Sequence, residues 1–185
     1  MALTPSSMLP LGTKAPSFNL LNTITGKNIS LEETRSDIAT VIMFICNHCP
    51  YVKHIQTVLV NIAKKYQAKE ISFIAINSND VEHYPDDSPD NMRKNAETYG
   101  YTFPYLFDET QTVAKAYHAA CTPDFYVFDH HLACVYRGRF DDSTPSNGIP
   151  VTGNDLSKAL DAILAEKTIK SDQKPSMGCN IKWKK

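Results

Sequence analysis

The chain has 185 residues, of which 42% are hydrophobic and 21% charged, and its formal net charge is −1. This length and composition suit one globular domain with a core of its own. The charges are interspersed, so no basic field exists to bind nucleic acid or an anionic membrane, and we expect neither as a partner. The longest apolar run, residues 41–46, is too short to span a membrane, and residues 1–10 lack the charged-then-apolar pattern of an export signal. We therefore expect a cytoplasmic protein.

The cysteine content points to chemistry rather than to a scaffold. Five cysteines are too few, and too odd a number, for a secreted domain held together by disulfides. Two of them, Cys46 and Cys49, are separated by only two residues. In a reducing compartment this spacing indicates a redox pair or part of a metal site.

The first half of the chain alternates between strand and helix patterns. An extended arm, residues 1–16, precedes short strands at 18–21 and 28–31 that flank a turn at Gly26. Continuous apolar, β-branched residues over 39–45 predict a strand buried on both faces that runs directly into Cys46. Apolar positions spaced by three and four then predict a helix from Pro50 to Tyr66, followed by a strand at 71–77. Strand, helix and strand form a right-handed parallel crossover, with the two cysteines at its first strand-to-helix junction.

The second half contains weaker patterns that complete the same domain. We expect helices at 90–99 and 110–117, a short strand at 105–107, an antiparallel hairpin at 124–128 and 133–139, and a last helix capped by Asn154. A lysine-rich tail, residues 166–185, still contains apolar residues and is expected to dock on the domain. The predicted organisation is therefore an arm (1–16), one domain (17–165) and a docked tail (166–185).

The segment Cys46-Asn47-His48-Cys49 places two sulfurs where a loop enters a helix, and Pro50 suits the first helical turn because no amide donor is needed there. Unpaired amides and the helix dipole stabilise a thiolate at this position, and His48 can add positive charge. Asn47, His48 and Pro50 are thus expected to modulate the pair. One sulfur can attack a substrate disulfide while the other resolves the mixed disulfide, which requires neither a metal nor an organic cofactor.

Three short motifs resemble one known family. Residues 12–18, Gly-Thr-Lys-Ala-Pro-Ser-Phe, resemble the opening of peroxiredoxins and thiol-specific antioxidants, and Cys49-Pro50 falls where that group has its peroxidatic cysteine. Thr122-Pro123 resembles the cis-proline dipeptide that faces the dithiol in thioredoxins. The chain is identified as a member of the thioredoxin superfamily, in its peroxiredoxin-like branch. The resemblance implies a three-layer α/β fold, a central mixed sheet flanked by helices, an N-terminal hairpin, and a substrate groove shaped by Thr122 and Pro123.

Two departures from the peroxiredoxin pattern favour disulfide exchange over peroxide reduction. Cys46 stands where those peroxidases have threonine or serine, and no arginine lies between Arg93 and Arg137 to assist breakage of the O–O bond. Thiol–disulfide exchange is therefore the leading prediction, and a thiol peroxidase that uses Cys49, with an antioxidant role, is the alternative. A non-enzymatic alternative is a copper- or zinc-binding module built from Cys46, Cys49 and either His48 or Cys121.

The remaining candidate residues lie near these motifs or in the tail. Cys121, beside Thr122, is a candidate third redox thiol, Cys134 is expected in the core, and Cys179 either resolves a disulfide or anchors the tail, with the anchor favoured. Residues 41–45 supply no buried carboxylate, which leaves His48 as the candidate base. The resemblance further suggests that the loops 84–89 and 137–142 form a substrate rim.

The order of attack is predicted from position. Cys46 leaves the strand end into the loop and is expected to be the more exposed thiol, whereas Cys49 is joined to the helix by Pro50. We therefore expect Cys46 to attack and Cys49 to resolve. The expected partners are a disulfide-containing protein or small molecule and a cellular dithiol reductant or oxidant.

Overall fold

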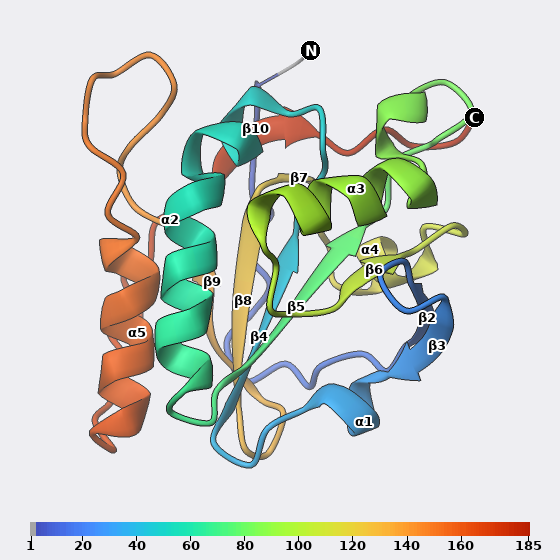
Figure 1. The fold of residues 1–185 in the computed structure, drawn as a ribbon. Helices are drawn as coiled ribbons and strands as arrows, with labels where there is room; N and C mark the ends of the chain where they lie inside the picture. The colour runs from blue at the N-terminus through green and yellow to red at the C-terminus, as the bar shows by residue number, and fades with distance from the viewer. Residues whose placement is uncertain (1–2) are drawn as a thin grey trace.

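The computed structural model describes residues 3–185, which fold around a mixed sheet of seven strands (Figure 1). The strands are hydrogen-bonded in the order β3-β2-β6-β5-β4-β8-β9. Their bounds are β2 Asn19–Asn22, β3 Lys27–Ser30, β4 Ala39–Phe44, β5 Ser72–Asn77, β6 Tyr105–Phe107, β8 Asp124–Asp129 and β9 Cys134–Gly138. Strands β2 and β3 form the predicted hairpin around Gly26.

Strand β4 lies in the interior of the sheet and leads to the cysteines. All six of its residues are buried, which explains its unbroken apolar and β-branched sequence. It pairs in parallel with β5 and antiparallel with β8. This double pairing fixes the carboxyl end of β4, and with it the start of the Cys46–Cys49 loop.

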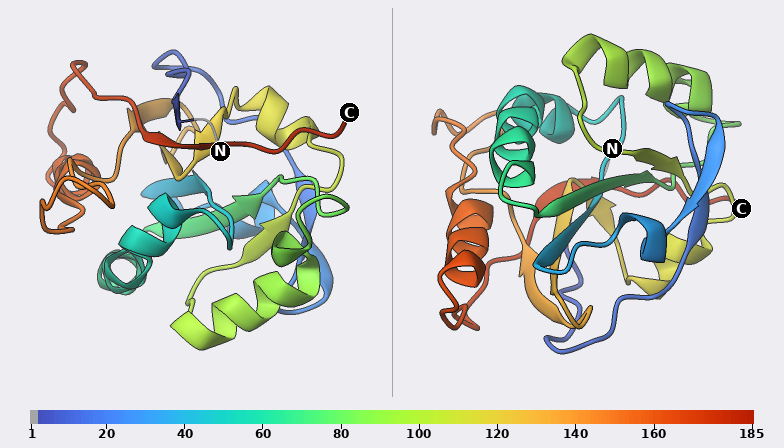
Figure 2. Two further views of the ribbon diagram at one scale, coloured as in Figure 1. Left: turned by 90° about the horizontal axis from the view of Figure 1, so that it is seen from above. Right: turned by 60° about the horizontal axis from the view of Figure 1, so that its bottom comes forward.

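Helices cover both faces of the sheet, which gives the predicted three layers (Figures 1 and 2). Buried side chains of α2 (Pro50–Gln67), α3 (Pro89–Tyr99) and α5 (Asn154–Leu164) belong to the core on one face. Those of α1 (Leu31–Thr34) and α4 (Thr112–Ala116) belong to the core on the other face. The predicted apolar face of α2 is confirmed, because Val52, Ile55, Leu59, Ile62 and Tyr66 are all buried. No helix within residues 3–185 is both long and apolar enough to cross a membrane.

A second, three-stranded sheet joins the two ends of the described chain. It contains β1 (Leu3–Pro5), β10 (Met177–Asn180) and β7 (Cys121–Thr122), with β10 in the middle and both pairings antiparallel. The arm and the tail therefore pair with each other beside the Thr122–Pro123 peptide bond, which is cis. This sheet is the main feature that sequence patterns did not predict.

The predicted cap of the last helix is wrong. The N-cap of α5 is Gly153, in the left-handed conformation at φ 64°, and Asn154 is already the first helical residue. The backbone angle favours glycine at this position. A Cβ atom on Gly153 would lie 2.2 Å from the end of the Ile62 side chain on α2, which would have to shift. The turn before α5 is instead stabilised by Asp141, whose Oδ2 accepts hydrogen bonds from the amides of Thr152 and Gly153.

Candidate active site

Cys46 and Cys49 lie in the loop between β4 and α2. Cys49 is the N-cap of α2 and Pro50 follows in the first turn, as the sequence predicted. Both side chains are buried, Cys46 at 1% exposed and Cys49 at 0%. Exposure therefore does not distinguish the two thiols. The structure does not support the expectation that Cys46 is the more exposed sulfur.

The surroundings of Cys49 stabilise a thiolate. Hydrogen bonding from the Cys46 thiol lowers the pKa of Cys49 most, and burial opposes this effect. The Cys179 thiol and the backbone amides of Val52 and Cys179 lower it further, to about 5. The Sγ atoms of Cys49 and Cys179 are 2.8 Å apart. The carbonyl oxygen of Thr122, 3.3 Å from the Cys49 Sγ, accepts from the protonated thiol and does not stabilise the thiolate.

Cys46 has the opposite character. Burial raises its pKa well above the ordinary value, and its hydrogen bond to Cys49 and the negative charge of Asp87 act in the same direction. Its Sγ also lies 3.3 Å from Oγ1 of Thr122, which favours the thiolate and only partly offsets the other effects. Of the two thiols, Cys49 is therefore the one that ionises first.

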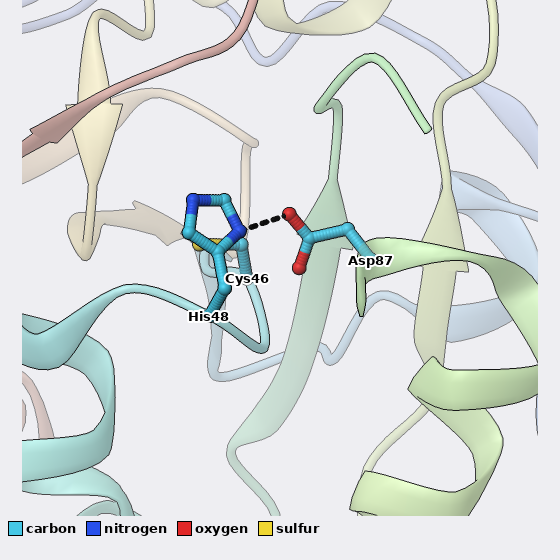
Figure 3. Close-up of side chains that lie close together, drawn as sticks. All are labelled: Cys46, His48 and Asp87. Atoms are coloured by element: carbon cyan, nitrogen blue, oxygen red, sulfur yellow. Dashed lines mark hydrogen bonds and ion pairs between the residues drawn. The ribbon is translucent and has the colours of Figure 1, made fainter. Parts of the chain in front are cut away.

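A hydrogen-bonded pair of a histidine and a buried carboxyl group adjoins Cys46 (Figure 3). Nδ1 of His48 lies 2.6 Å from Oδ2 of Asp87, whose side chain is fully buried. Burial raises the pKa of Asp87, but hydrogen bonds from His48, from Asn79 and from the amide of Asn47 bring it below the usual value. The Cys46 Sγ, the His48 Nδ1 and a carboxylate oxygen of Asp87 all lie within 4.8 Å of one another.

Asp87 supplies the buried carboxylate that the strand before Cys46 lacks, and sequence reasoning did not assign it this place. It comes from the loop at 84–89, which was interpreted as a substrate rim. Part of that loop instead packs against the cysteine loop, because the Tyr84 ring stacks on His48 at 5.5 Å and Asn47 donates to the carbonyl of Asp86. The one available signal was the run of turn residues after β5, which places a carboxylate at the same sheet edge as the cysteines.

Thr122 and Pro123 lie beside the dithiol, as the resemblance implied. Thr122 contacts Cys46 through its hydroxyl and Cys49 through its carbonyl. Pro123 also lines a cavity of about 90 Å³. Its lining includes Tyr51, His54, Pro123, Arg139, Asp141 and Met177, so the loop at 137–142 does border a hollow near the dithiol.

The other three cysteines are all buried and free. The Sγ of Cys121 lies 3.9 Å from the carbonyl oxygen of Pro123, and burial raises its pKa strongly, so it is poorly suited to be a third redox thiol. Cys134 packs in the core on the α4 side. Cys179 contacts Cys49 directly, and burial together with Cys49 raises its pKa to about 12, so it remains a hydrogen-bond donor.

A second buried carboxyl, Asp124, begins β8 directly after Pro123. Its Oδ2 accepts from the hydroxyls of Ser6 and Tyr126, whereas its Oδ1 is buried without a hydrogen-bond partner among the described residues. Burial raises its pKa to about 7. Since Ser6 follows β1, this carboxyl ties the three-stranded sheet to the main one.

One cluster within residues 3–185 has the composition of a metal site, and it differs from the ligand set that the sequence suggested. It consists of Cys46, His48 and Asp87. Two ligands of one tetrahedral zinc ion would be roughly 3.3 Å apart. The separation of 2.6 Å between His48 Nδ1 and Asp87 Oδ2 is that of a shared proton. The arrangement therefore favours proton transfer over metal binding.

The fold and the paired thiols at the start of α2 define a thioredoxin-like redox protein. The AhpC/TSA family matches residues 11–136, and the chain belongs to this family. Its place in the thioredoxin superfamily, within the peroxiredoxin-like branch, is thereby confirmed.

Solved structures with high similarity cover almost the whole chain. An uncharacterized conserved protein from Geobacillus kaustophilus is 62% identical, with a TM-score of 0.98 over 100% of this chain and 97% of that one. A hypothetical protein from Sinorhizobium meliloti 1021 is 44% identical, with a TM-score of 0.95 over 98% of each chain. A secreted disulfide oxidoreductase from Mycobacterium tuberculosis shares the fold at 15% identity, with a TM-score of 0.60 over 78% of this chain and 95% of that one. Among curated proteins, none matches the chain.

Proposed function

We propose that the protein is a thiol–disulfide oxidoreductase that cycles between a Cys46/Cys49 dithiol and the corresponding disulfide. The observation that carries this proposal is the asymmetric pair at the N-terminus of α2. The thiolate of Cys49 is stabilised by several donors, while Cys46 holds its proton within hydrogen-bond reach of it. A nucleophile and a resolving thiol are thereby held together.

The geometry supports a reaction that begins at Cys49, which reverses the order of attack predicted from the sequence. The Cys49 thiolate attacks one sulfur of a substrate disulfide, the substrate S–S bond breaks, and the leaving thiolate takes a proton from solvent. Cys46 then loses its proton and attacks the Cys49 sulfur of the mixed disulfide. This forms the Cys46–Cys49 bond and releases the second substrate thiol.

His48 and Asp87 are placed to assist the second step. The His48 imidazole lies between the buried carboxylate and the cysteine loop, and its Nδ1 is within 4.8 Å of the Cys46 sulfur. A neutral imidazole that donates its Nδ1 proton to Asp87 can accept the thiol proton at Nε2, which is buried without a hydrogen-bond partner among the described residues, and Asp87 stabilises the resulting imidazolium. A cellular dithiol would then restore the reduced state, and the same steps in reverse would oxidise a substrate.

The direct test is reduction of insulin or of a small disulfide with dithiothreitol as electron donor. We expect activity in the wild-type chain and a loss on the order of a hundredfold or more in Cys49→Ser and in Cys46→Ser combined with Cys179→Ser, because the nucleophile or every neighbouring resolving thiol is then missing. In a chain that also carries Cys179→Ser, which removes the sulfur next to Cys49, Cys46→Ser should accumulate mixed disulfides at Cys49, whereas Cys49→Ser should not. Cys134→Ser, a buried cysteine in the opposite core, is the matched control. Oxidised protein with Cys46 and Cys49 both free by mass spectrometry would contradict the proposal, as would a stoichiometric metal after purification without chelator.

A thiol peroxidase is the second candidate, favoured by the lowered pKa of Cys49 and by family membership. The donors around the Cys49 sulfur, within the described chain, are thiols and backbone amides, and no arginine is among them. A peroxide would thus lack the cationic donor that stabilises charge as the O–O bond breaks. We expect stopped-flow measurement with hydrogen peroxide to give a second-order rate constant several orders of magnitude below that of efficient peroxidases. A rate comparable to theirs would make peroxide reduction the principal function and Cys46 its resolving thiol.

A further inference from the structure

Strand β10 lies against Thr122 and Pro123, the residues that the family resemblance assigns to the substrate groove. It pairs antiparallel with β7, so that Cys179 lies opposite Thr122 and Asn180 opposite Cys121. Addition of a strand to a sheet edge is a common way of binding an extended peptide. Here the added strand belongs to the chain itself, and it brings a cysteine to the nucleophile: the Sγ atoms of Cys179 and Cys49 are 2.8 Å apart.

The approach of β10 is built into the sequence at Gly178. A Cβ atom at this position would lie 2.0 Å from the carbonyl oxygen of Thr122 and 2.7 Å from its carbonyl carbon. Backbone atoms cannot move aside as a flexible side chain can, so only glycine permits this separation. The residue next to Cys179 is therefore the one that allows the strand to lie against the Thr122–Pro123 edge.

Contacts on both sides of β10 hold it in register. Before the strand, the Ser176 hydroxyl donates to the carbonyl of Gly138 at 2.7 Å and the Ser176 carbonyl accepts from the amide of Ser6 at 2.8 Å. After the strand, the amide of Ile181 donates to the carbonyl of Ala120 at 3.0 Å, and the amide of Lys182 donates to Oδ1 of Asn79 at 2.8 Å. Cys179 is only 4% exposed. A mere anchor for the tail needs no sulfur in contact with Cys49, because these bonds already fix it.

We propose that Cys179 is a third redox thiol, which β10 presents to Cys49 in place of a substrate cysteine. The inference rests on the proposed dithiol cycle, because its oxidising equivalent comes from the Cys46–Cys49 disulfide. The sulfur of Cys179, once deprotonated, attacks the Cys49 sulfur. The Cys49–Cys179 bond forms, the Cys46–Cys49 bond breaks, and Cys46 leaves as a thiolate that regains a proton. The exchange is redox-neutral, so it needs no further oxidant, and it stores the disulfide on the tail.

The test isolates the Cys49–Cys179 pair in a Cys46→Ser background and uses oxidised glutathione as the probe. The Cys49 thiolate should first form a mixed disulfide and release one half of the glutathione. Cys179 should then displace the other half, leaving an intramolecular Cys49–Cys179 disulfide and no adduct by mass spectrometry. Cys46→Ser combined with Cys179→Ser should instead keep the glutathione on Cys49. Cys46→Ser combined with Cys134→Ser, the matched control, should release both halves.

A variant at Gly178 tests whether the position of β10, and not only the presence of the Cys179 sulfur, is needed for the reaction. In the Cys46→Ser background, Gly178→Ala retains every sulfur of the pair but blocks the approach of β10, and it should also keep the glutathione adduct. Met177→Ala, an exposed position on the same strand, should not. In the wild-type chain, limited oxidation should give Cys49 paired with Cys46 in some molecules and with Cys179 in others, which needs no variant to fold.

The outcomes distinguish this inference from the proposed function. A stable glutathione adduct on Cys49 in Cys46→Ser, with Cys179 free, would overturn the inference and leave the dithiol cycle intact. An inactive wild-type chain without a Cys46–Cys49 disulfide would overturn the proposed function. In that second case, a Cys49–Cys179 disulfide in Cys46→Ser would still establish Cys179 as a redox thiol. Direct oxidation, and not the Cys46–Cys49 disulfide, would then be the source of its oxidising equivalent.

Discussion

Ultraviolet titration of the reduced protein is expected to detect one thiolate that forms with a midpoint of about pH 5 and belongs to Cys49. The thiols of Cys46 and Cys179 donate to this sulfur, together with the amides of Val52 and Cys179. Its folded pKa therefore lies below that of an ordinary cysteine. The lowered pKa of Cys49 stabilises the folded state. This contribution to stability is fully present above the pKa that Cys49 has in the unfolded chain, and it is lost as the pH falls toward 5.

Variants assign the titration to one sulfur. Cys49→Ser should remove the transition, and Cys46→Ala should raise its midpoint because it deletes the largest favourable hydrogen bond. Cys46→Ser, which keeps a hydroxyl donor, should raise it less. Cys134→Ser should leave the midpoint unchanged. A transition near pH 5 that persists in Cys49→Ser would return the thiolate to Cys46 and restore the order of attack predicted from the sequence.

The change in stability caused by Asp124→Asn is expected to have opposite signs at low and at high pH. Burial raises the pKa of Asp124 to about 7, well above its ordinary value of 3.8. The folded state thus holds a proton that the unfolded state has lost, and the stability from this group falls as the pH rises between those values. At about 1.4 kcal/mol per pH unit, the loss is on the order of 4 kcal/mol by neutral pH. Asparagine stays neutral and avoids this loss of stability. Its amide, however, adds a buried hydrogen-bond donor without a partner, which costs roughly 1–3 kcal/mol of stability.

Denaturant unfolding at two pH values provides the measurement. Asp124→Asn should be less stable than the wild-type chain near pH 4, close to the ordinary pKa of the carboxyl, where most of that loss has not yet occurred, and at least as stable near pH 8, so that the difference between the two proteins changes with pH. Asp142→Asn, an exposed position, is the control and should give a small difference that does not change. Equal destabilisation by Asp124→Asn at both pH values would mean that the carboxyl is ionised throughout.

Periodicity was sufficient to predict the main sheet and its large helices. The unbroken apolar sequence of β4 and the apolar stripe of α2 each depend on burial along a single element, and such burial is visible in a local pattern. The cap of α5 was mispredicted because it depends on space. Gly153 packs closely against Ile62, which lies far away in the chain, and nothing near Asn154 reveals that neighbour.

The site was predictable only where its residues follow one another in sequence. The motif Cys46-Asn47-His48-Cys49 and the dipeptide Thr122-Pro123 were found by spacing and by resemblance. Asp87 was not assigned to the site, and Cys179 was named only as a resolving thiol or, preferably, a tail anchor. The places of both depend on a loop that folds back and on a strand pairing across most of the chain. The roles of the two central thiols depend in turn on those neighbours, so the order of attack could not be obtained from the cysteine loop alone.

Both central sulfurs are buried and Cys179 of β10 lies against Cys49, which has a consequence for reaction rates. Neither Cys46 nor Cys49 presents more than 1% of its surface, so no bulky disulfide can reach them in the closed arrangement. Reaction with a protein partner then requires a local opening in which β10 separates from β7, followed by chemistry in the open form. Each 1.4 kcal/mol or so of opening free energy lowers the observed rate about tenfold when closing is fast. The turnover rate with large substrates would accordingly report how firmly the tail is held, independently of how reactive the Cys49 thiolate is.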